Sequence, residues 1–456
     1  MKSAFSSGTS GGWWRSSGIL ALAVFLLGAT PAGAADMNDA VFDQVVRQAQ
    51  QAAAASYQPN EMVLPQVLQS LDYDTYRMIT FRRETGLWFG EKSRFQVQLF
   101  HPGYIYKEPV AINEVVDGQV HPVDFGPKFF RYPRFDPALL RESKLGFAGF
   151  RLLYPLEHRE PVDEVISFIG ASYFRALALG QVYGISARGL AIDTAENIPE
   201  EFPVFREFWL CRPAPKARAM EFFARLESAS VSGAYRFQIK PGTETIVEVE
   251  MHLFFRKSVQ VFGLAPLTSM FWRDESNPRP PDDTRPEVHD SDTLSIETAA
   301  GKVESHPLEQ RDHVTTLLFP EKSPRGFGLL QRDRDPAHYH DSEAQYSRRP
   351  SVFVEAIKDW GKGTVRLMQL PTRNEYFDNV VAFWQPEKKP VAGDELQFRY
   401  RLRWFNRESN KDRNGAVRRN SSDEPDNFRR GRTQLERGAR AREDLSLRTA
   451  GRDGTG

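Results

Sequence analysis

Apolar and polar residues alternate in several short runs, and this pattern predicts a mainly β protein. Residues 95–100 read FQVQLF and residues 245–255 read TIVEVEMHLFF, which is the two-residue period of a half-buried strand. Asp117-Gly118 and Pro241-Gly242-Thr243 each separate two such runs, as turn residues do in hairpins. Many strands separated by turns predict a large β-sandwich and not a βαβ array.

Helical patterns are fewer and shorter. The main one covers residues 39–55, where Val41, Val45 and Val46 begin an apolar stripe after a capping Asn38. Shorter helices are expected within residues 64–71, 137–141 and 217–227.

The composition fits a large folded protein. The 456 residues include 33 Phe, which is ample apolar material for two or three domains. Cys211 is the only cysteine, so an internal disulfide is impossible. Because Cys211 ends the apolar run FWLC, we expect a buried structural thiol and not a catalytic one.

Both ends of the chain differ from the body. Lys2 and Arg15, an apolar run over residues 18–27 and the Ala-Gly-Ala at 32–34 predict a signal peptide over residues 1–35, with a retained membrane anchor as the alternative. Residues 405–456 are rich in Arg, Asn, Ser and Gly, which predicts a disordered polar tail. The body between them is slightly acidic, which argues against a nucleic-acid partner.

One stretch, residues 324–355, mixes arginines, carboxylates, histidines and tyrosines with apolar β-type runs. Such groups are costly to bury without partners, which indicates a polar groove on the β scaffold. If His338 and His340 share one face of a strand they could ligate zinc, but no clear third ligand accompanies them. We therefore expect no metal and no cofactor.

Paired carboxylates are the sharper chemical possibility. Glycoside hydrolysis needs one carboxylic acid to protonate the leaving oxygen and one base to activate water. Residue chemistry alone leaves seven candidates open: Asp274, Asp290, Asp292, Asp333, Asp335, Asp341 and Asp378. The P-loop, HExxH, CxxC and G-x-S-x-G motifs are absent, and Gly326-Phe327-Gly328 is better explained by strands that approach closely.

Six longer stretches resemble one known family, the periplasmic glucan biosynthesis proteins G and D. They lie in order along the chain: 169–195 (IGASYFRALALGQVYGISARGLAIDTA), 285–292 (RPEVHDSD), 325–335 (RGFGLLQRDRD), 348–355 (RRPSVFVE), 359–367 (DWGKGTVRL) and 378–390 (DNVVAFWQPEKKP). The resemblance covers residues 39–404. It departs from the family at residues 302–306, where a tryptophan-rich segment is replaced by KVESH.

The resemblance implies a galactose-mutarotase-like β-sandwich over residues 36–390. A truncated immunoglobulin-like module would begin at 391–404. Some family members resemble inverting endo-β-1,2-glucanases. Carried across, this makes Asp378 the general acid and Asp290 the base, which acts through a water relay that includes Tyr346.

The ligand implied by the resemblance is a β-1,2-glucan in the periplasm. The residues expected to bind it are Arg332, Asp333, Tyr339, Arg348, Trp272 and Trp360. Two other functions stay open: a non-catalytic carbohydrate-binding partner of the membrane glucosyltransferase, and a structural envelope protein. Oligomeric state does not follow from the sequence.

Overall fold

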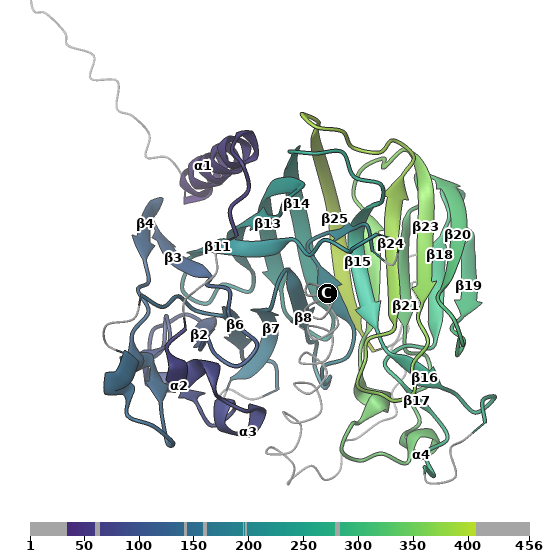
Figure 1. Ribbon diagram of the computed structural model, residues 1–456, viewed down its shortest axis with the longest axis horizontal. Helices are drawn as coiled ribbons and strands as arrows, with labels where there is room; N and C mark the ends of the chain where they lie inside the picture. The colour runs from purple at the N-terminus through teal and green to yellow at the C-terminus, as the bar shows by residue number, and fades with distance from the viewer. Residues whose placement is uncertain are drawn as a thin grey trace, which may run out of the picture.

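Two large β-sheets face each other across an apolar core (Figure 1). The structure, a computed structural model, describes residues 34–59, 64–140, 144–157, 162–194, 196, 198–278 and 283–406. Residues 1–33 and 407–456, which hold nearly all of the predicted signal peptide and tail, lie outside this part. Within it, no helix is long and apolar enough to cross a membrane.

The first sheet has ten strands. In spatial order they are β2 (Gln96–Phe100), β6 (Gly149–Tyr154), β7 (Asp163–Ile169), β8 (Tyr173–Ala176), β9 (Ser186–Arg188), β15 (Phe262–Ser269), β24 (Val380–Pro386), β23 (Lys362–Gln369) and β20 (Thr315–Lys322), with β10 (Ala191–Ile192) paired to β15. The pairings are antiparallel throughout the described strands.

The second sheet has eleven strands. In spatial order they are β19 (Val303–Pro307), β18 (Thr293–Glu297), β21 (Gly326–Leu330), β22 (Ser351–Ala356), β25 (Glu395–Phe405), β14 (Thr245–Phe255), β13 (Val231–Lys240), β12 (Met220–Glu227), β11 (Val204–Cys211), β3 (Ala111–Val116) and β4 (Gln119–Pro122). β3 runs parallel to β11.

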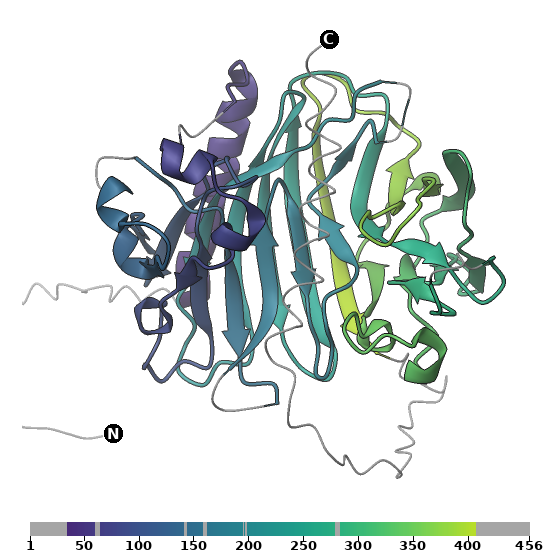
Figure 2. The same ribbon diagram turned by 60° about the horizontal axis from the view of Figure 1, so that its bottom comes forward.

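The remaining elements are two small sheets, helices and 3-10 turns outside the two large sheets. Two small sheets pair β1 (Thr80–Phe81) with β5 (Phe130–Arg131) and β16 (Phe271–Arg273) with β17 (Val288–His289). The helices are α1 (Ala34–Ala54), α2 (Gln66–Gln69), α3 (Tyr73–Tyr76) and α4 (Pro336–Tyr339), and the 3-10 turns are η1 (Arg83–Thr85), η2 (Pro127–Phe129), η3 (Pro137–Leu140) and η4 (Tyr346–Arg348). β16, β17 and α4 lie together at one end (Figures 1 and 2).

Aromatic rings from both sheets fill the core. Phe150 and Phe168 of the ten-stranded sheet stack with their centroids 5.3 Å apart, and Phe168 meets the edge of Phe222 from the opposite sheet at 5.5 Å. The alternation read in residues 245–255 is confirmed, because Val247 and Leu253 of β14 face this core and are fully buried. Burial of apolar area on this scale is the main force that holds the two sheets together.

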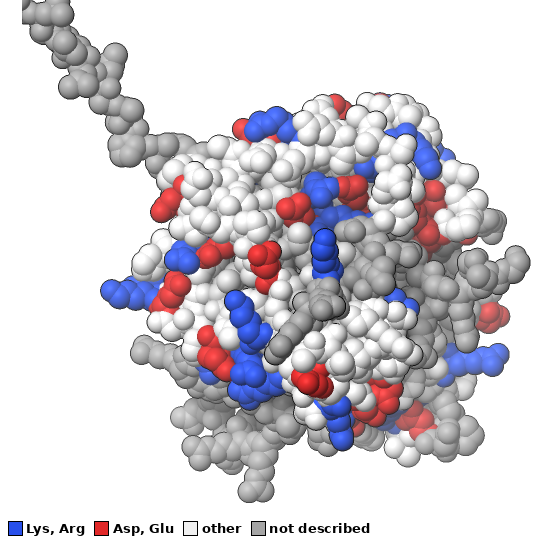
Figure 3. All heavy atoms as spheres, turned by 60° about the vertical axis from the view of Figure 1, so that its left-hand side comes forward, with Lys and Arg blue, Asp and Glu red and all other residues white. Residues whose placement is uncertain are grey.

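Helix α1 covers the outer face of the eleven-stranded sheet (Figure 2). Its stripe, which includes Phe42 and Val45, packs on Trp209, Phe223 and Cys211 in a second apolar cluster. Burial raises the pKa of the Cys211 thiol, so the thiol stays protonated and unreactive, as predicted. The side of the molecule that carries α1 shows acidic and basic side chains intermixed (Figure 3).

The predicted hairpins are present. β3 and β4 join through Asp117 and Gly118, which both have positive φ, the backbone that a tight hairpin turn requires. Gly326 and Gly328 of β21 also behave as expected, since an added Cβ would collide with the carbonyl oxygens of Val354 and Val352. The two glycines let β21 approach β22.

Two sequence predictions are wrong. Residues 217–227 were expected to be helical, but they hold strand β12, which pairs with β11 and β13. Its apolar residues recur at every second position, and cross-strand packing overrides the helix propensity of its Met, Glu and Leu. Residues 391–404 were expected to open a separate module, but they hold most of β25, which lies between β14 and β22 and buries Trp404 in the common core.

Candidate functional site

A row of polar side chains crosses the outer face of the ten-stranded sheet. Gln98, Arg151, Ser167 and Arg175 are successive register partners on β2, β6, β7 and β8. Their neighbours along each strand, such as Phe150, point into the core. Side chains in register on one face of a sheet lie within contact of one another, so the four residues form one continuous polar strip.

This strip lines a cavity of about 660 Å³, a volume typical of ligand sites. The same cavity is lined by rings such as Tyr73, Tyr76 and Tyr183 and by the predicted binding residue Arg348. Hydrogen-bonding groups beside flat rings suit a ligand that has hydroxyl groups and apolar CH faces, because the rings can stack on the latter.

Hydrogen bonds hold the polar groups of the cavity in place. Arg151 donates to Glu164 at 2.8 Å and to Gln98 at 3.0 and 2.7 Å. Tyr183 donates to the other oxygen of Glu164 at 2.6 Å. Burial, and then the charge of Glu164, raise the pKa of Tyr183 well above its usual range, so this hydroxyl remains a proton donor.

Asp378 lies beyond Arg175, at the end of the polar strip. Its side chain is 3% exposed, and its Oδ2 is 3.7 Å from Nη2 of Arg175. The adjacent Asn379 fixes this segment, since its side chain accepts a bond from the Phe271 amide at 2.9 Å and donates to the Phe271 carbonyl at 2.9 Å. Asp378 is therefore held in a defined position next to the first strand residue of β16.

Asp290 lies on a neighbouring segment. It follows β17, and its amide donates to the carbonyl of Met270 at 2.8 Å. Met270 precedes Phe271, so the segments that carry Asp290 and Asp378 bind to consecutive residues. The segments that carry Asp290 and Asp378 are thus adjacent in the fold, although the two residues are far apart in the sequence.

Asp290 and Tyr346 are linked through Arg349. The Arg349 guanidinium donates to Oδ1 of Asp290, and both side chains are almost fully buried. The same guanidinium lies over the Tyr346 ring, 4.4 Å from its centroid. The Tyr346 hydroxyl donates to Glu375, which stands three residues before Asp378.

Arg285 is a charged centre that the sequence reasoning did not single out. It donates to Glu375 at 2.9 Å, to Asp341 at 2.8 Å and to Asp283 at 2.8 Å. Its bonds, with those of Arg273, outweigh burial and hold the pKa of the Asp283 carboxyl far below its usual range. Arg285 opens the RPEVHDSD stretch, whereas nothing in the local pattern marks Glu375.

Three of the predicted binding residues lie near α4 and β16. Arg332 is exposed and bonds Asp292 through its Nε at 2.8 Å. Asp333 binds His338, as described below. Trp272 is half-buried under the guanidinium of Arg273, 4.2 Å from the ring centroid.

Two predicted binding residues are buried, and neither presents its ring at the surface. Trp360 is 6% exposed and packs in the sandwich core, with Trp384 and Tyr400 each 6.2 Å away. Tyr339 is 1% exposed and donates to the Asp333 carbonyl at 3.1 Å. Both aromatic residues contribute packing, which sequence cannot distinguish from stacking on a ligand.

The histidine pair is also arranged differently from the prediction. His338 lies on the short helix α4 and not on a strand, and His340 follows it with a left-handed backbone at φ 51°. His338 Nδ1 bonds Oδ2 of Asp333 at 2.6 Å. The imidazole therefore meets acidic groups, and not its histidine neighbour.

These observations define a large, almost wholly antiparallel β-sandwich protein with a polar, ring-lined cavity and a buried carboxylate, Asp378, beside the last residue of its polar strip. The model of the family "Periplasmic glucan biosynthesis protein, MdoG" matches residues 41–443. The chain belongs to this family and takes part in periplasmic glucan biosynthesis. The match runs beyond residue 404, where we expected the resemblance to end.

Curated relatives agree with the family match. The chain is 46% identical over 379 residues to "Glucans biosynthesis protein G" of Rhodopseudomonas palustris strain BisA53, covering 82% of this chain and 75% of the relative. It is 46% identical over 388 residues to the protein of that name from Ralstonia nicotianae, covering 84% and 76%.

Similarities to solved structures are weak. A GH36 α-galactosidase from Geobacillus stearothermophilus has a TM-score of 0.29 at 8% identity, covering 56% of this chain and 39% of that one. A galactose mutarotase related enzyme from Lactobacillus acidophilus has a TM-score of 0.24 at 8% identity, covering 56% and 94%. TM-scores this low support no conclusion about the chain.

Proposed function

We propose that this protein binds a β-1,2-linked glucan in the cavity of the ten-stranded sheet and trims it by inverting hydrolysis. The observation that carries the proposal is the polar strip that ends at Asp378, with Asp290 on the adjoining segment. Family membership points to a glucan as the ligand. The positions of the two acidic residues favour cleavage of the glucan over binding alone.

Each carboxylate has one role in this proposal. Asp378 gives its proton to the glycosidic oxygen as the bond to the anomeric carbon breaks. A water oxygen bonds that carbon from the opposite face, and the proton lost by the water passes through a relay that includes Tyr346 to Asp290. Arg349 holds Asp290 in place through its bond to Oδ1.

A relay removes the usual limit on carboxylate separation. Inverting pairs that share one water stand roughly 6.5–9.5 Å apart. A base that acts through intervening groups can lie further away. The buried contact between Arg349 and the Tyr346 ring supports such a path, since it fixes the tyrosine relative to the carboxylate that Arg349 binds.

The direct test is release of reducing ends from linear β-1,2-glucan. We expect Asp378→Asn to lower the rate by about 10²–10⁴-fold, the usual contribution of a general acid. Asp312→Asn is the matched control, since the Asp312 side chain is 93% exposed, and it should leave the rate unchanged. Equal release by the wild type and Asp378→Asn would reject hydrolysis at this site.

One observation favours a second candidate, glucan binding without turnover. Tyr339 and Trp360 are buried, and β19 carries no aromatic residue where the resemblance leads one to expect tryptophans. Fewer exposed rings mean weaker stacking on sugars. Calorimetric binding of sophorose-type oligomers without reducing-end release would support a carbohydrate-binding partner of the membrane glucosyltransferase.

A further inference from the structure

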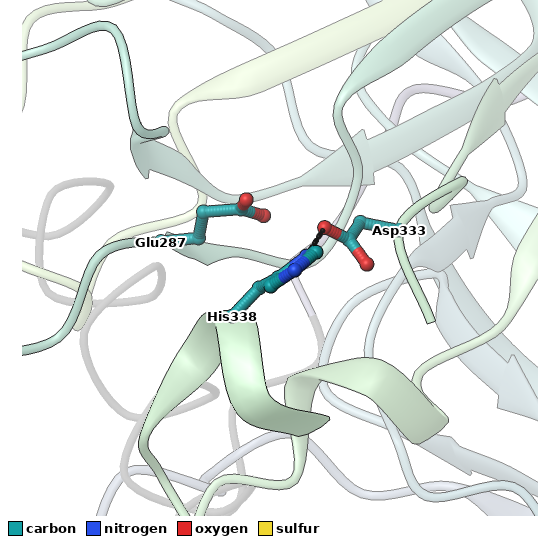
Figure 4. Close-up of side chains that lie close together, drawn as sticks. All are labelled: Glu287, Asp333 and His338. Atoms are coloured by element: carbon teal, nitrogen blue, oxygen red, sulfur yellow. Dashed lines mark hydrogen bonds and ion pairs between the residues drawn. The ribbon is translucent and has the colours of Figure 1, made fainter. Parts of the chain in front are cut away.

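Three side chains from separate segments converge beside α4, outside the proposed pair of carboxylates. Glu287 immediately precedes β17, Asp333 follows β21, and His338 belongs to α4. Their ligand atoms all lie within 4.8 Å of one another, and the side chains point toward a common centre (Figure 4). This is a mixed set of two carboxylates and one imidazole.

The charges around Glu287 are unusual for a buried acid. The Glu287 side chain is 6% exposed. Two other carboxyl groups, those of Asp333 and Glu275, lie within hydrogen-bonding reach of it. Buried carboxylates are normally paired with cations or coordinate metals, so a buried acid that faces two other acids indicates a missing positive charge.

A buried histidine, His289, also contacts Glu287. His289 Nε2 is 2.9 Å from Oε2 of Glu287, and its Nδ1 is 2.8 Å from Oε1 of Gln331. Gln331 Nε2 donates to the His289 carbonyl and to Tyr339, which fixes the amide so that its oxygen faces the imidazole. His289 Nδ1 must therefore donate to Gln331, and a second proton lies between Nε2 and Oε2 of Glu287.

The bond between His289 and Glu287 is thus a contact from a second, buried side chain to one of the three converging residues. Hydrogen bonds from outer groups to ligating carboxylates are typical of metal sites.

We propose that Glu287, Asp333 and His338 bind one divalent transition-metal ion, such as Mn²⁺ or Zn²⁺, with Glu275 as an outer carboxylate. An imidazole with carboxylates suits these ions, whereas Ca²⁺ and Mg²⁺ prefer oxygen ligands alone. His338 is half exposed, so water fills the remaining positions. The ion replaces the proton shared by Asp333 and His338, and that proton is released to solvent.

The bound ion would tie three segments together at one end of the sandwich. These are the start of β17, the segment after β21 and α4. His289 adjoins Asp290, and η4, which begins at Tyr346, follows α4 in the chain. The site would thus stabilise the surroundings of Asp290 and Tyr346, but metal binding does not depend on whether the protein cleaves glucan.

The test is calorimetric titration of the metal-stripped full chain with MnCl₂, ZnCl₂ and CaCl₂, each alone and without glucan. We expect one Mn²⁺ or Zn²⁺ per chain and at least 10-fold weaker binding of Ca²⁺. Titrations in two buffers of different ionisation enthalpy should show net proton release on binding. The melting temperature of the wild type should rise with added Mn²⁺.

Variants locate the ion. His338→Ala and Glu287→Gln should each weaken Mn²⁺ binding by 10-fold or more and abolish the rise in melting temperature. His340→Ala is the matched control, an exposed histidine two residues away, and should bind as the wild type does. Because His338 is half exposed, its removal should leave the circular dichroism spectrum unchanged. Absence of stoichiometric binding, or unchanged binding in His338→Ala, would overturn the proposal.

Discussion

The outer faces of the two sheets differ sharply. The eleven-stranded sheet is covered by α1, whose Phe42 and Val45 pack on Trp209 and Phe223. The ten-stranded sheet instead presents the strip from Gln98 to Arg175 to an open cavity. One sandwich therefore uses one outer face for stability and leaves the other free for a ligand, and the two can be disturbed separately.

The largest effect is expected on the face covered by α1. Phe42 is 3% exposed and its ring lies 5.3 Å from that of Phe223. Phe42→Ala should lower the free energy of unfolding by about 3 kcal/mol through lost burial and a residual cavity. Urea unfolding measures the change. Gln51→Ala, an exposed change on the same helix, is the control. A loss of glucan cleavage by folded Phe42→Ala would contradict the separation of the two faces.

The next effect concerns pH and lies on the cavity side. Burial lowers the pKa of His101 from 6.5 to about 4, although the Pro102 carbonyl opposes this. The folded state thus holds His101 neutral. Its contribution to stability is complete above the unfolded pKa of about 6.5 and is lost as the pH falls toward 4, by about 3 kcal/mol in all.

His101→Gln should flatten this part of the stability curve, as followed by urea unfolding at pH 7, 5.5 and 4.5. Other carboxyl groups also titrate in this range, so the difference between the wild type and the variant is the quantity to compare. His313→Gln, whose imidazole is largely exposed, should keep the wild-type slope. Equal slopes for the wild type and His101→Gln would contradict a lowered pKa, because they would mean that His101 binds its proton equally well in the folded and unfolded states.

Substitution of one arginine on each face tests most directly whether the two outer faces have separate roles. Arg175 lies beside Asp378, whereas Arg236 lies over the Phe42 ring at 4.4 Å on the face covered by α1. Arg175→Gln should reduce kcat/KM on β-1,2-glucan by about 10–100-fold, or about 1.4–2.7 kcal/mol, because it removes the positive charge 3.7 Å from Asp378. Arg236→Gln should change stability and leave kcat/KM intact. The measurement is reducing-end release by both variants. Similar losses of kcat/KM in Arg175→Gln and Arg236→Gln would mean that the two faces do not act independently.

The sequence predicts the strands better than the site, for a physical reason. Alternation fixes which residues of β14 face the core, and Asp117-Gly118 fixes a hairpin, because both signals are local. Cavity-lining Arg151 and Arg175 depend on register between strands that the local pattern does not encode. The roles of Asp290 and Asp378 came from family resemblance, and Glu375 carries no local signal because its partners Arg285 and Tyr346 come from other segments.

Aromatic residues show the same limit. Trp360 and Tyr339 were predicted to contact sugar, but a ring that packs in the core and a ring that stacks on a ligand look alike in a sequence. Strand β25 was misjudged because its partners are distant in the chain: paired residues lie 141–159 positions away in β14 and 44–54 positions away in β22. Burial and pairing decide these cases, and both are properties of the fold.

The smallest effect is expected from the ion pair that joins α1 to the sheet. Asp39 Oδ1 accepts a bond from Arg236 Nη2 at 2.6 Å, but the Asp39 side chain is 59% exposed, so water and salt screen the pair. Asp39→Asn should lower the free energy of unfolding by no more than about 0.5 kcal/mol, and less at 1 M salt. In the double variant Asp39→Asn/Phe42→Ala, the loss of free energy of unfolding should be close to the sum of the losses in the two single variants. A clear departure from that sum would mean that Arg236, which contacts both side chains, couples them. A loss for Asp39→Asn as large as that for Phe42→Ala would mean that charge, and not apolar burial, holds the helix on this face.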